Sequence, residues 1–318
     1  MNPYHQITSE ERYSLGLLRQ RGLRPAAIAR VLGRHRSSIT REIQRNATHH
    51  DGTYRPQLAN WYAHSRRSRS RRNTQFTSVD WARVEALVRE DWSPEQVAGR
   101  LRLDGGPTIS HETIYRRVWA DKRAGGALYL HLRGARKQKR KRYGAYDSRG
   151  RLAGKRPIAT RPPGAEHRSR FGHWEGDTVL GAGQAGPCVL TLVERKSGFL
   201  AIGKLAQRTG AFVNDRAQQL ISIQPRLVRT ITVDNGTEFH SYQALEQRVP
   251  ARFYFATPHH AWERGTNENT NGLVRQYLPK GASMADLTQH DCNRLADKLN
   301  RRPRKRLGYR TPEEVYVP

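Results

Sequence analysis

Three acidic residues carry the most chemical information in this 318-residue chain: Asp177, Asp234 and Glu268. The first two lie in short runs of the kind that form β-strands, and the third lies at the start of a run that favours a helix. Mg²⁺ prefers hard oxygen ligands, and Mn²⁺ accepts the same kind of ligand. Carboxylates that converge from two strands and one helix therefore predict a site for Mg²⁺, in which Mn²⁺ can substitute.

The chemistry expected of such a site is an in-line displacement at phosphorus. Two metal ions about 3.5–4 Å apart can activate an attacking hydroxyl and stabilise the leaving oxygen. Asp177, in a central strand, can bridge the two ions, and Asp234 can hold one of them. An Asp in a strand, or an Asp-Asn-Gly sequence, is more often a turn residue than a ligand. The prediction therefore rests on the three acids together.

Helical periodicity favours Glu268 over the nearby Glu263 as the third acid. At about 100° per residue, Asn271 and Arg275 lie within about 60° of Glu268, and Leu273 lies about 140° away. Glu268 thus heads a polar face, opposite the face expected to pack on a sheet. Glu263 would fall about 140° from it, on the packed side.

The charge of the chain is uneven. Its net charge is +29, and residues 1–170 carry 37 Lys and Arg against 14 Asp and Glu. Residues 171–318 carry 20 against 14. A front half this basic indicates a region that binds a polyanion. With the three acids behind it, the expected substrate is a phosphodiester of a nucleic acid.

Residues 1–50 are predicted to form a helix-turn-helix DNA-binding domain of three helices. The first helix is expected to turn Tyr13, Leu17 and Leu18 inward. The third, about His35–Arg45, suits a major groove. A three-helix bundle without a DNA-binding role is the alternative. The outer face of the third helix presents the predicted DNA contacts: Arg36, Ser37, Ser38, Thr40, Arg41, Gln44 and Arg45.

Residues 51–77 are expected to be a basic linker or a basic helix. Residues 78–120 are predicted to form a second helix-turn-helix, which leaves Arg116 and Arg117 for DNA contacts. A packing module between domains is the alternative. Residues 121–170 are predicted to be a second basic linker, whose side chains can lie along phosphates and add affinity without sequence information.

Residues 171–318 are predicted to form a mixed α/β domain. A strand hairpin comes first, and strands then alternate with helices. The predicted strands are Trp174–Leu180, Cys188–Glu194, Phe199–Leu205, Thr230–Val233 and Arg252–Phe255, and the predicted helices are Thr209–Ile223, Ser241–Gln247, Thr266–Tyr277 and Asp286–Asn300.

The motifs around the three acids resemble those of bacterial insertion-sequence transposases of the DDE class, specifically the IS30 family. The resemblance is carried by Trp174–Asp177, by Asp234–Phe239 and above all by the long motif Glu263–Gly281, and the tail Arg302–Tyr309 also matches. Thirty-three residues separate the second acid from the third, similar to the spacing in that family. The resemblance covers nearly the whole chain, because such proteins also carry N-terminal helix-turn-helix modules.

This resemblance implies a multidomain chain, in which all-α N-terminal helix-turn-helix modules precede an α/β ribonuclease-H-like catalytic domain of the integrase type. It implies that Asp177, Asp234 and Glu268 bind two Mg²⁺ ions. Hydrolysis at the ends of the element would free 3′-hydroxyls, which would then attack target DNA.

The resemblance also implies the partners. Double-stranded DNA is expected, both as the inverted repeats of the element and as the target. Asn271 and Arg275 are expected to contact the scissile strand, and Arg264 a flanking phosphate. Because two DNA ends must be paired, we expect at least a homodimer on DNA.

Two other functions fit parts of the sequence. A helix-turn-helix regulator whose α/β domain only dimerises would show no metal-dependent cleavage. A simple nuclease would cut DNA without particular ends and would join no strands.

Cys188 and Cys292 belong to no CxxC pair, which disfavours a zinc site or a disulfide framework. No apolar run approaches the ~18–20 residues that span a bilayer, so we expect a bacterial cytoplasmic protein associated with the nucleoid.

Overall fold

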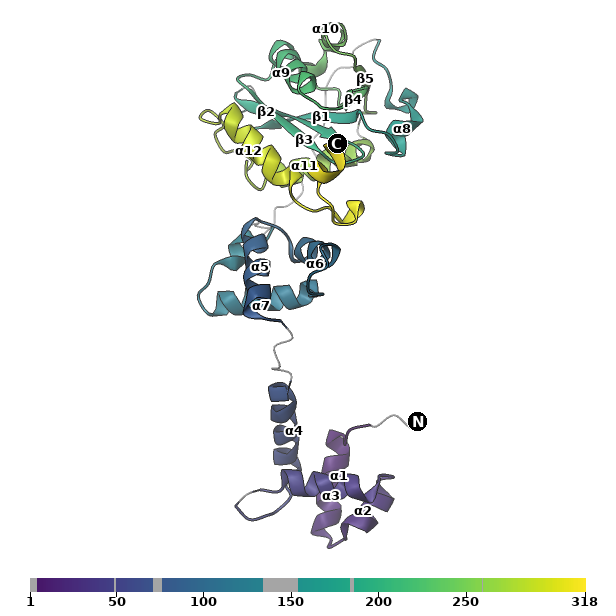
Figure 1. The fold of residues 1–318 in the computed structure, drawn as a ribbon, viewed down its shortest axis with the longest axis vertical. Coiled ribbons are helices and arrows are strands. Elements are labelled where there is room, and N and C mark those ends of the chain that lie inside the picture. Colours follow the sequence, from purple (N-terminus) through teal and green to yellow (C-terminus); the bar gives the residue numbers. More distant parts are fainter. Residues whose placement is uncertain (1–4, 49, 71–75, 134–153, 184–185, 259) are drawn as a thin grey trace. The chain divides into compact units, whose positions relative to one another are not determined.

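The computed structural model describes residues 5–48, 50–70, 76–133, 154–183, 186–258 and 260–318 (Figure 1). Backbone contacts divide the chain into an N-terminal unit, Met1–Thr77, and a C-terminal unit, Ser78–Pro318. None of the helices in the described ranges is long and apolar enough to cross a membrane. The basic run at residues 136–142, the centre of the second predicted linker, lies outside the described residues.

The described part of the N-terminal unit is helical. It consists of α1 (Ser9–Gln20), α2 (Pro25–Val31), α3 (Arg36–Asn46) and α4 (Pro56–Ser70). A capping box between Thr8 and Glu11 starts α1, since each side chain binds the backbone N–H of the other residue. Leu15, Ile28 and Ile39 are fully buried in the core between the helices. Of the two alternatives for the basic segment, a linker or a helix, residues 56–70 form a helix.

The predicted inward face of α1 is wrong at two positions. Tyr13 and Leu17 are 46% and 62% exposed, whereas Leu15 is buried. The reason is the packing of α4 on α1. Pro56 lies so close to α1 that a Cβ on Gly16 would come within 2.4 Å of its Cγ. The side of α1 that carries Leu15 and Gly16 is thus covered, and the Tyr13–Leu17 side faces solvent.

The C-terminal unit begins with three helices, α5 (Ser78–Arg89), α6 (Pro94–Leu103) and α7 (His111–Arg123), followed by the 3₁₀ turn η1 (Leu128–His131). Ser93 caps α6 in a capping box with Gln96, and Ser110 caps α7. Ile114 and Val118 of α7 are buried.

A five-stranded sheet forms the centre of the rest of this unit, within the residues that the structure describes. Its strands are β1 (His173–Leu180), β2 (Cys188–Glu194), β3 (Leu200–Leu205), β4 (Thr230–Val233) and β5 (Arg252–Phe255), in the order β3-β2-β1-β4-β5. β1, β2 and β3 form an antiparallel meander, and β4 and β5 run parallel to β1. The predicted mixed α/β architecture is confirmed.

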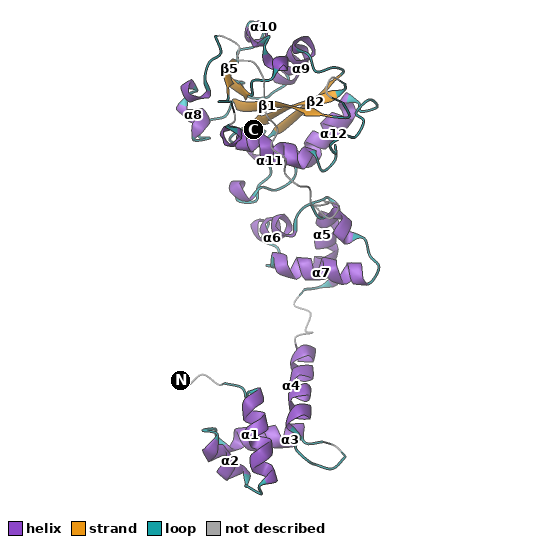
Figure 2. Cartoon of the chain, turned by 180° about the vertical axis from the view of Figure 1, so that it is seen from behind, coloured by secondary structure: helices purple, strands orange, loops and turns teal. Residues whose placement is uncertain are grey.

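Helices cover both faces of the sheet (Figure 2). α9 (Gly210–Ser222) and α10 (Tyr242–Glu246) lie on one face, over a core that includes Trp174, Ile231 and Phe253. α11 (Gly265–Val274) and α12 (Gln289–Asn300) lie on the other, over Val179 and Val193. Short helical turns connect these elements: η2 (Ile158–Thr160), α8 (Pro163–Glu166), η3 (Thr237–Phe239), η4 (Ala261–Arg264), η5 (Lys305–Leu307) and α13 (Pro312–Tyr316).

The α5–α7 segment is docked on the α/β domain through Asp91, which follows α5. Its carboxylate pairs with Lys298 of α12 at 2.8 Å and accepts a hydrogen bond from the Tyr277 hydroxyl at 2.8 Å. Nearby, α6 and the C-terminal segment are in close contact, because a Cβ on Gly99 would lie 2.2 Å from the Tyr309 ring. The second helical segment thus has a fixed place on the domain that carries the acids.

Candidate active site

Asp177 and Asp234 lie side by side because β1 and β4 run parallel in register. Glu175 on β1 pairs with Thr232 on β4, and each aspartate comes two residues later along the chain. Side chains alternate between the two faces along a strand. Asp177 therefore points to the same face of the sheet as Glu175, and Asp234 reaches that face from the end of β4.

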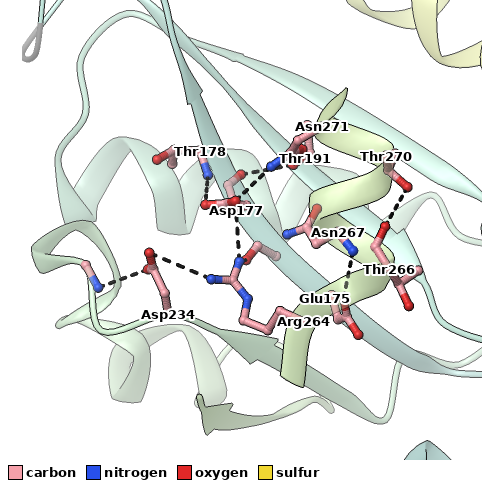
Figure 3. A network of polar contacts seen from close by, with 12 residues as sticks. Glu175, Asp177, Thr178, Thr191, Asp234, Arg264, Thr266, Asn267, Thr270 and Asn271 are labelled. Carbon is pink, nitrogen blue, oxygen red and sulfur yellow. Dashed lines mark hydrogen bonds and ion pairs between the residues drawn. The ribbon is translucent and has the colours of Figure 1, made fainter. Parts of the chain in front are cut away.

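The guanidinium of Arg264 lies between the two aspartates (Figure 3). Its Nη2 is 3.5 Å from Oδ2 of Asp177, and its Nη1 is 3.7 Å from Oδ2 of Asp234. It also donates a 2.6 Å hydrogen bond to the carbonyl of Gly176. Burial raises the pKa of Asp177, the charge of Arg264 lowers that pKa, and the charge of Asp234 raises it. Two partly buried carboxylates thus share one positive charge.

α11 fixes the orientation of the Asp177 carboxylate through Asn271. The Nδ2 of Asn271 donates to Oδ2 of Asp177 at 2.7 Å, and its Oδ1 accepts from the Thr191 hydroxyl on β2 at 3.1 Å. The backbone N–H of Thr178 donates to the other carboxylate oxygen at 2.9 Å. Contacts from β1, β2 and α11 therefore leave this side chain little rotational freedom.

A buried ion pair ties the first turn of α11 to β1. Glu175 has a fully buried side chain that pairs with Arg195 and accepts a hydrogen bond from the N–H of Asn267 at 2.8 Å. The first N–H groups of a helix lack partners within the helix and favour a negative charge. This role of Glu175 was not predicted from the sequence, although the Trp174–Asp177 motif contains the residue.

Glu268 is exposed on α11, one turn after Arg264 and one turn before Asn271. Residues three and four apart lie on the same side of a helix, so Glu268 shares the side of α11 that contacts Asp177. Glu263 instead accepts a hydrogen bond within its own loop. Among the residues that the structure describes, no three His, Cys, Asp or Glu side chains gather closely enough to hold a metal ion. The structure thus brings two of the predicted acids together and leaves the third nearby on the helix.

The groups around Arg264 suit a divalent cation. Oxygens of Asp177 and Asp234 already face one shared positive charge, and carboxylate oxygens are the ligands that Mg²⁺ takes. The guanidinium occupies the position between the two aspartates. A metal ion bound by both would require Arg264 to move aside.

Two charged side chains beside the aspartates were not anticipated. Glu238, four residues after Asp234, is buried and pairs with Arg208 at 2.5 Å. Lys155 donates to Oδ1 of Asn235 at 3.1 Å; burial lowers the pKa of Lys155, and the charge of Asp234 raises it. Glu238 belongs to the Asp-Asn-Gly motif, which could have pointed to it. Lys155 lies in a stretch that resembles a linker and offered no such signal.

The residues of α3 predicted to contact DNA lie on its outer face, while Ile39 and Ile43 point into the core. Arg41 is held in place by the carbonyl and the hydroxyl of Ser37, at 3.2 and 3.0 Å. Arg36, Arg41, Gln44 and Arg45 are exposed, and Ser37, Ser38 and Thr40 are half-buried. Contact between these side chains and DNA stays a prediction.

Several other predicted DNA contacts have partners inside the protein. Arg117 donates two hydrogen bonds to Glu85, at 3.0 and 2.9 Å. Arg116 bonds the Thr113 hydroxyl at 3.1 Å. Arg275 donates to the carbonyl of Leu180 at 2.7 Å and so braces α11 against the end of β1. Arg264, expected at a flanking phosphate, and Asn271 lie within the carboxylate site itself.

The similar proteins of known function reported below are all transposases of insertion sequences. Residues 3–46 match the model of a helix-turn-helix domain. The chain is 40% identical to a transposase for insertion sequence element IS4351 of Bacteroides fragilis, over 98% of this chain and 95% of that protein. It is 36% identical to the transposase for IS1086 of Cupriavidus metallidurans, over 98% and 94%. It is 33% identical to the transposase InsI for IS30A of Escherichia coli, over 97% and 82%.

One similar solved structure is the catalytic core domain of BIV integrase, which covers 46% of this chain and 93% of its own. The two are 19% identical in sequence, with a TM-score of 0.36.

Proposed function

The chain belongs to the IS30 family of bacterial insertion-sequence transposases, and on this premise we propose how it cuts and joins DNA. It is a DDE-class transposase, whose N-terminal helix-turn-helix region binds DNA and precedes a ribonuclease-H-like α/β domain. A regulator with a non-catalytic α/β domain is not favoured, because the relatives are transposases over nearly their full length.

The proposed reaction has two steps. Hydrolysis at the ends of the element frees 3′-hydroxyls, and each 3′-hydroxyl then attacks a phosphodiester of target DNA. Both steps are in-line displacements at phosphorus, so one site can serve both. The observation that carries the proposal is the pair Asp177 and Asp234 around one shared positive charge, with Glu268 on the side of α11 that holds Asp177.

Enzymes of this class use a divalent metal. We assign two Mg²⁺ ions, replaceable by Mn²⁺, to Asp177, Asp234 and Glu268; when bound, they activate the attacking hydroxyl and stabilise the leaving oxygen. Neighbouring side chains hold these ligands in position. Asn271 fixes the Asp177 carboxylate, and Glu175 anchors the helix that carries Glu268.

The N-terminal unit selects the DNA. The exposed face of α3 has the shape and charge to enter a major groove, where Arg and Gln side chains read base edges. We assign to it the inverted repeats of the element, bound by at least a homodimer so that two ends are paired. We therefore propose that the protein acts on nucleoid DNA in the bacterial cytoplasm.

The test is cleavage of a DNA duplex that carries the element's ends, with Mg²⁺. Asp177→Ala, Asp234→Ala and Glu268→Ala should each lower the rate by about 10³-fold or more, because each removes a ligand whose contribution is several kcal/mol. Binding to the same DNA in EDTA should not change. Glu263→Gln is the matched control, since among the described residues Glu263 has its hydrogen-bond partners, Thr257 and His260, within its own loop, and it should keep cleavage.

Full cleavage by all three alanine variants would refute the assignment. A second assay separates a transposase from a nuclease. End DNA that already carries a free 3′-hydroxyl should be joined to a plasmid by the native protein, and a nuclease would join none.

A further inference from the structure

A second polar site lies at the other end of the parallel strands, away from the end of β4 that carries Asp234. It is a cavity of about 570 Å³. Its floor is a row of residues in register across three strands: His173 on β1, Thr230 on β4 and Arg252 on β5. His173 precedes Asp177 by four residues on β1, so both side chains point to the same face, about 13 Å apart along the strand.

The walls of this cavity are basic. Arg170 and Arg229 line it together with Arg252, and the lining contains no Asp or Glu. Within the part of the chain that the structure describes, no hydrogen bond or ion pair engages these three guanidinium groups. Arg195 and Arg208 of the same unit, by contrast, are paired with carboxylates.

His173 adds a buried donor or acceptor at the floor. Its side chain is 3% exposed, and its Nδ1 is hydrogen-bonded to the Thr230 hydroxyl at 2.8 Å. Its Nε2 is directed at the α8 wall, 3.5 Å from where a Cβ on Gly164 would lie. Burial lowers the pKa of His173, and the charges of four nearby arginines, Arg229 first, lower it further. The cavity thus has a positive potential with no internal counter-charge from its lining.

We propose that this cavity binds a backbone phosphate of the DNA substrate, outside the carboxylate site. Guanidinium groups match the geometry of phosphate oxygens and remain charged at all physiological pH values. The volume is in the range of pockets that hold small ligands, and it admits a nucleotide unit.

The position of the cavity favours DNA over a free anion. It shares a face of β1 with Asp177, and about 13 Å corresponds to about four nucleotides at 3.4 Å of rise per nucleotide. Glu175 lies between the two sites on β1 and is fully buried, so a strand cut at the carboxylates reaches the cavity over the protein surface, and four nucleotides is about the shortest path. This inference rests on the proposed function, because the strand that it holds is the one cut at Asp177 and Asp234.

The first experiment measures the salt dependence of DNA binding by the full chain, in EDTA, by fluorescence anisotropy. Each phosphate that the protein neutralises contributes about 0.9 to the slope of log affinity against log salt concentration. A variant with Arg170→Ala, Arg229→Ala and Arg252→Ala removes the whole site for one phosphate and should therefore lose about 1 from this slope. The three Arg→Lys changes should preserve the slope and show that the fold is intact.

Arg248→Ala is the matched control, because Arg248 is already paired with Asp215 at 3.0 Å, and its slope should equal that of the native protein. An unchanged slope in the triple-alanine variant would overturn the proposal. No cleavage is measured, so a failure of the catalytic assignment would leave this result unaffected, and the reverse also holds.

The second experiment locates the phosphate. Single methylphosphonate groups, which are uncharged, are placed along the strand that is cut. One position, at least about four nucleotides from the scissile bond, should weaken binding by the native protein and not by the triple-alanine variant. If every position weakens both proteins equally, the cavity does not hold the DNA backbone.

Pyrophosphate distinguishes the two sources of phosphate. If pyrophosphate raises the Tm of the native protein but not of the triple-alanine variant, while the salt slope for DNA is the same in both, the site binds a free anion and the assignment to DNA is wrong. A lower salt slope in the triple variant, with the methylphosphonate effect lost at one position, supports the assignment.

Discussion

Arg264 decides the state of the carboxylate site at the scale of single residues. Its guanidinium takes the place between Asp177 and Asp234 where the sequence led us to expect a metal ion. Without a cation there, the two neighbouring carboxylates would repel each other, and the pKa of Asp177, which burial already raises, would rise further. Arg264 therefore stabilises the metal-free site and competes with the metal for the same oxygens.

This competition predicts the effect of Arg264→Gln. The variant should bind Mn²⁺ more tightly, by about tenfold, since an opposing charge close to both ligands is removed. In EDTA, its Tm should fall, because the two carboxylates lose their shared counter-ion. Isothermal titration calorimetry and thermal unfolding measure these effects independently of cleavage.

Arg216→Gln is the control for this prediction, since the partner of Arg216 within the described residues is a backbone carbonyl, that of Lys204. It should leave Mn²⁺ affinity unchanged. Equal Mn²⁺ affinity in Arg264→Gln and the native protein would contradict the competition.

At the scale of elements, Asp91 joins the α5–α7 segment to the α/β domain. It lies between α5 and α6 at a φ of 63°, a left-handed conformation that Asp and Asn tolerate better than most residues. Its carboxylate contacts Lys298, Tyr277 and His131. Burial raises the pKa of Asp91, but hydrogen bonds from these three partners lower it by more, so the pKa lies below its usual value. The ionised carboxylate is therefore the form that docks α5–α7 on the α/β domain.

Asp91→Asn keeps the backbone conformation and the size of the side chain but removes the charge. We expect a loss of about 1–2 kcal/mol in the free energy of unfolding at pH 7, because Asp91 is largely buried while Lys298 is partly exposed. Urea unfolding measures it. Asp297→Asn, an exposed position on α12, should change little.

The stability difference between the native protein and Asp91→Asn should also depend on pH. A carboxylate whose pKa is lowered by folding contributes stability above its unfolded pKa of about 4. That contribution is lost as pH falls through the lower folded pKa. The difference in stability between the native protein and Asp91→Asn should therefore be full at neutral pH and disappear in acid. A difference that grows below pH 4 would show that Asp91 acts through another contact.

At the scale of the whole molecule, the region expected to bind DNA and the domain that carries the acids differ in charge. Residues 1–170 carry a net charge of +23 and residues 171–318 a net charge of +6. Non-specific attraction to phosphates is thus concentrated ahead of the catalytic domain, and this attraction weakens steeply with salt. A transposase also has to bring two DNA ends together. We expect one chain, with one copy of each helix-turn-helix segment, to bind one end.

We therefore expect assembly on DNA. Light scattering of the protein with end DNA should give the mass of at least two chains, and Asp177→Ala should assemble equally, because pairing precedes cutting. A single chain per complex at every protein concentration would contradict this expectation.

The sequence by itself determined the elements and the chemistry that they carry. Strand bounds were predicted to within one residue, because alternating and buried apolar runs are local signals. The bounds of β2, β4 and β5 agree with the structure. Helix-turn-helix patterning, the uneven charge and the motifs around Asp177, Asp234 and Glu268 indicated a DNA transposase, which the relatives confirm.

Only the tertiary structure decided which side chains meet. The pairing of Glu175 with Arg195, the place of Arg264 between two aspartates and the docking of Asp91 join segments that lie far apart in the sequence. The buried face of α1 is the one on which Leu15 packs with Ile28 and Ile39 and Gly16 lies against Pro56. Local periodicity carries no information about such contacts, because they depend on the register of β1, β4 and β5 and on how helices pack against them.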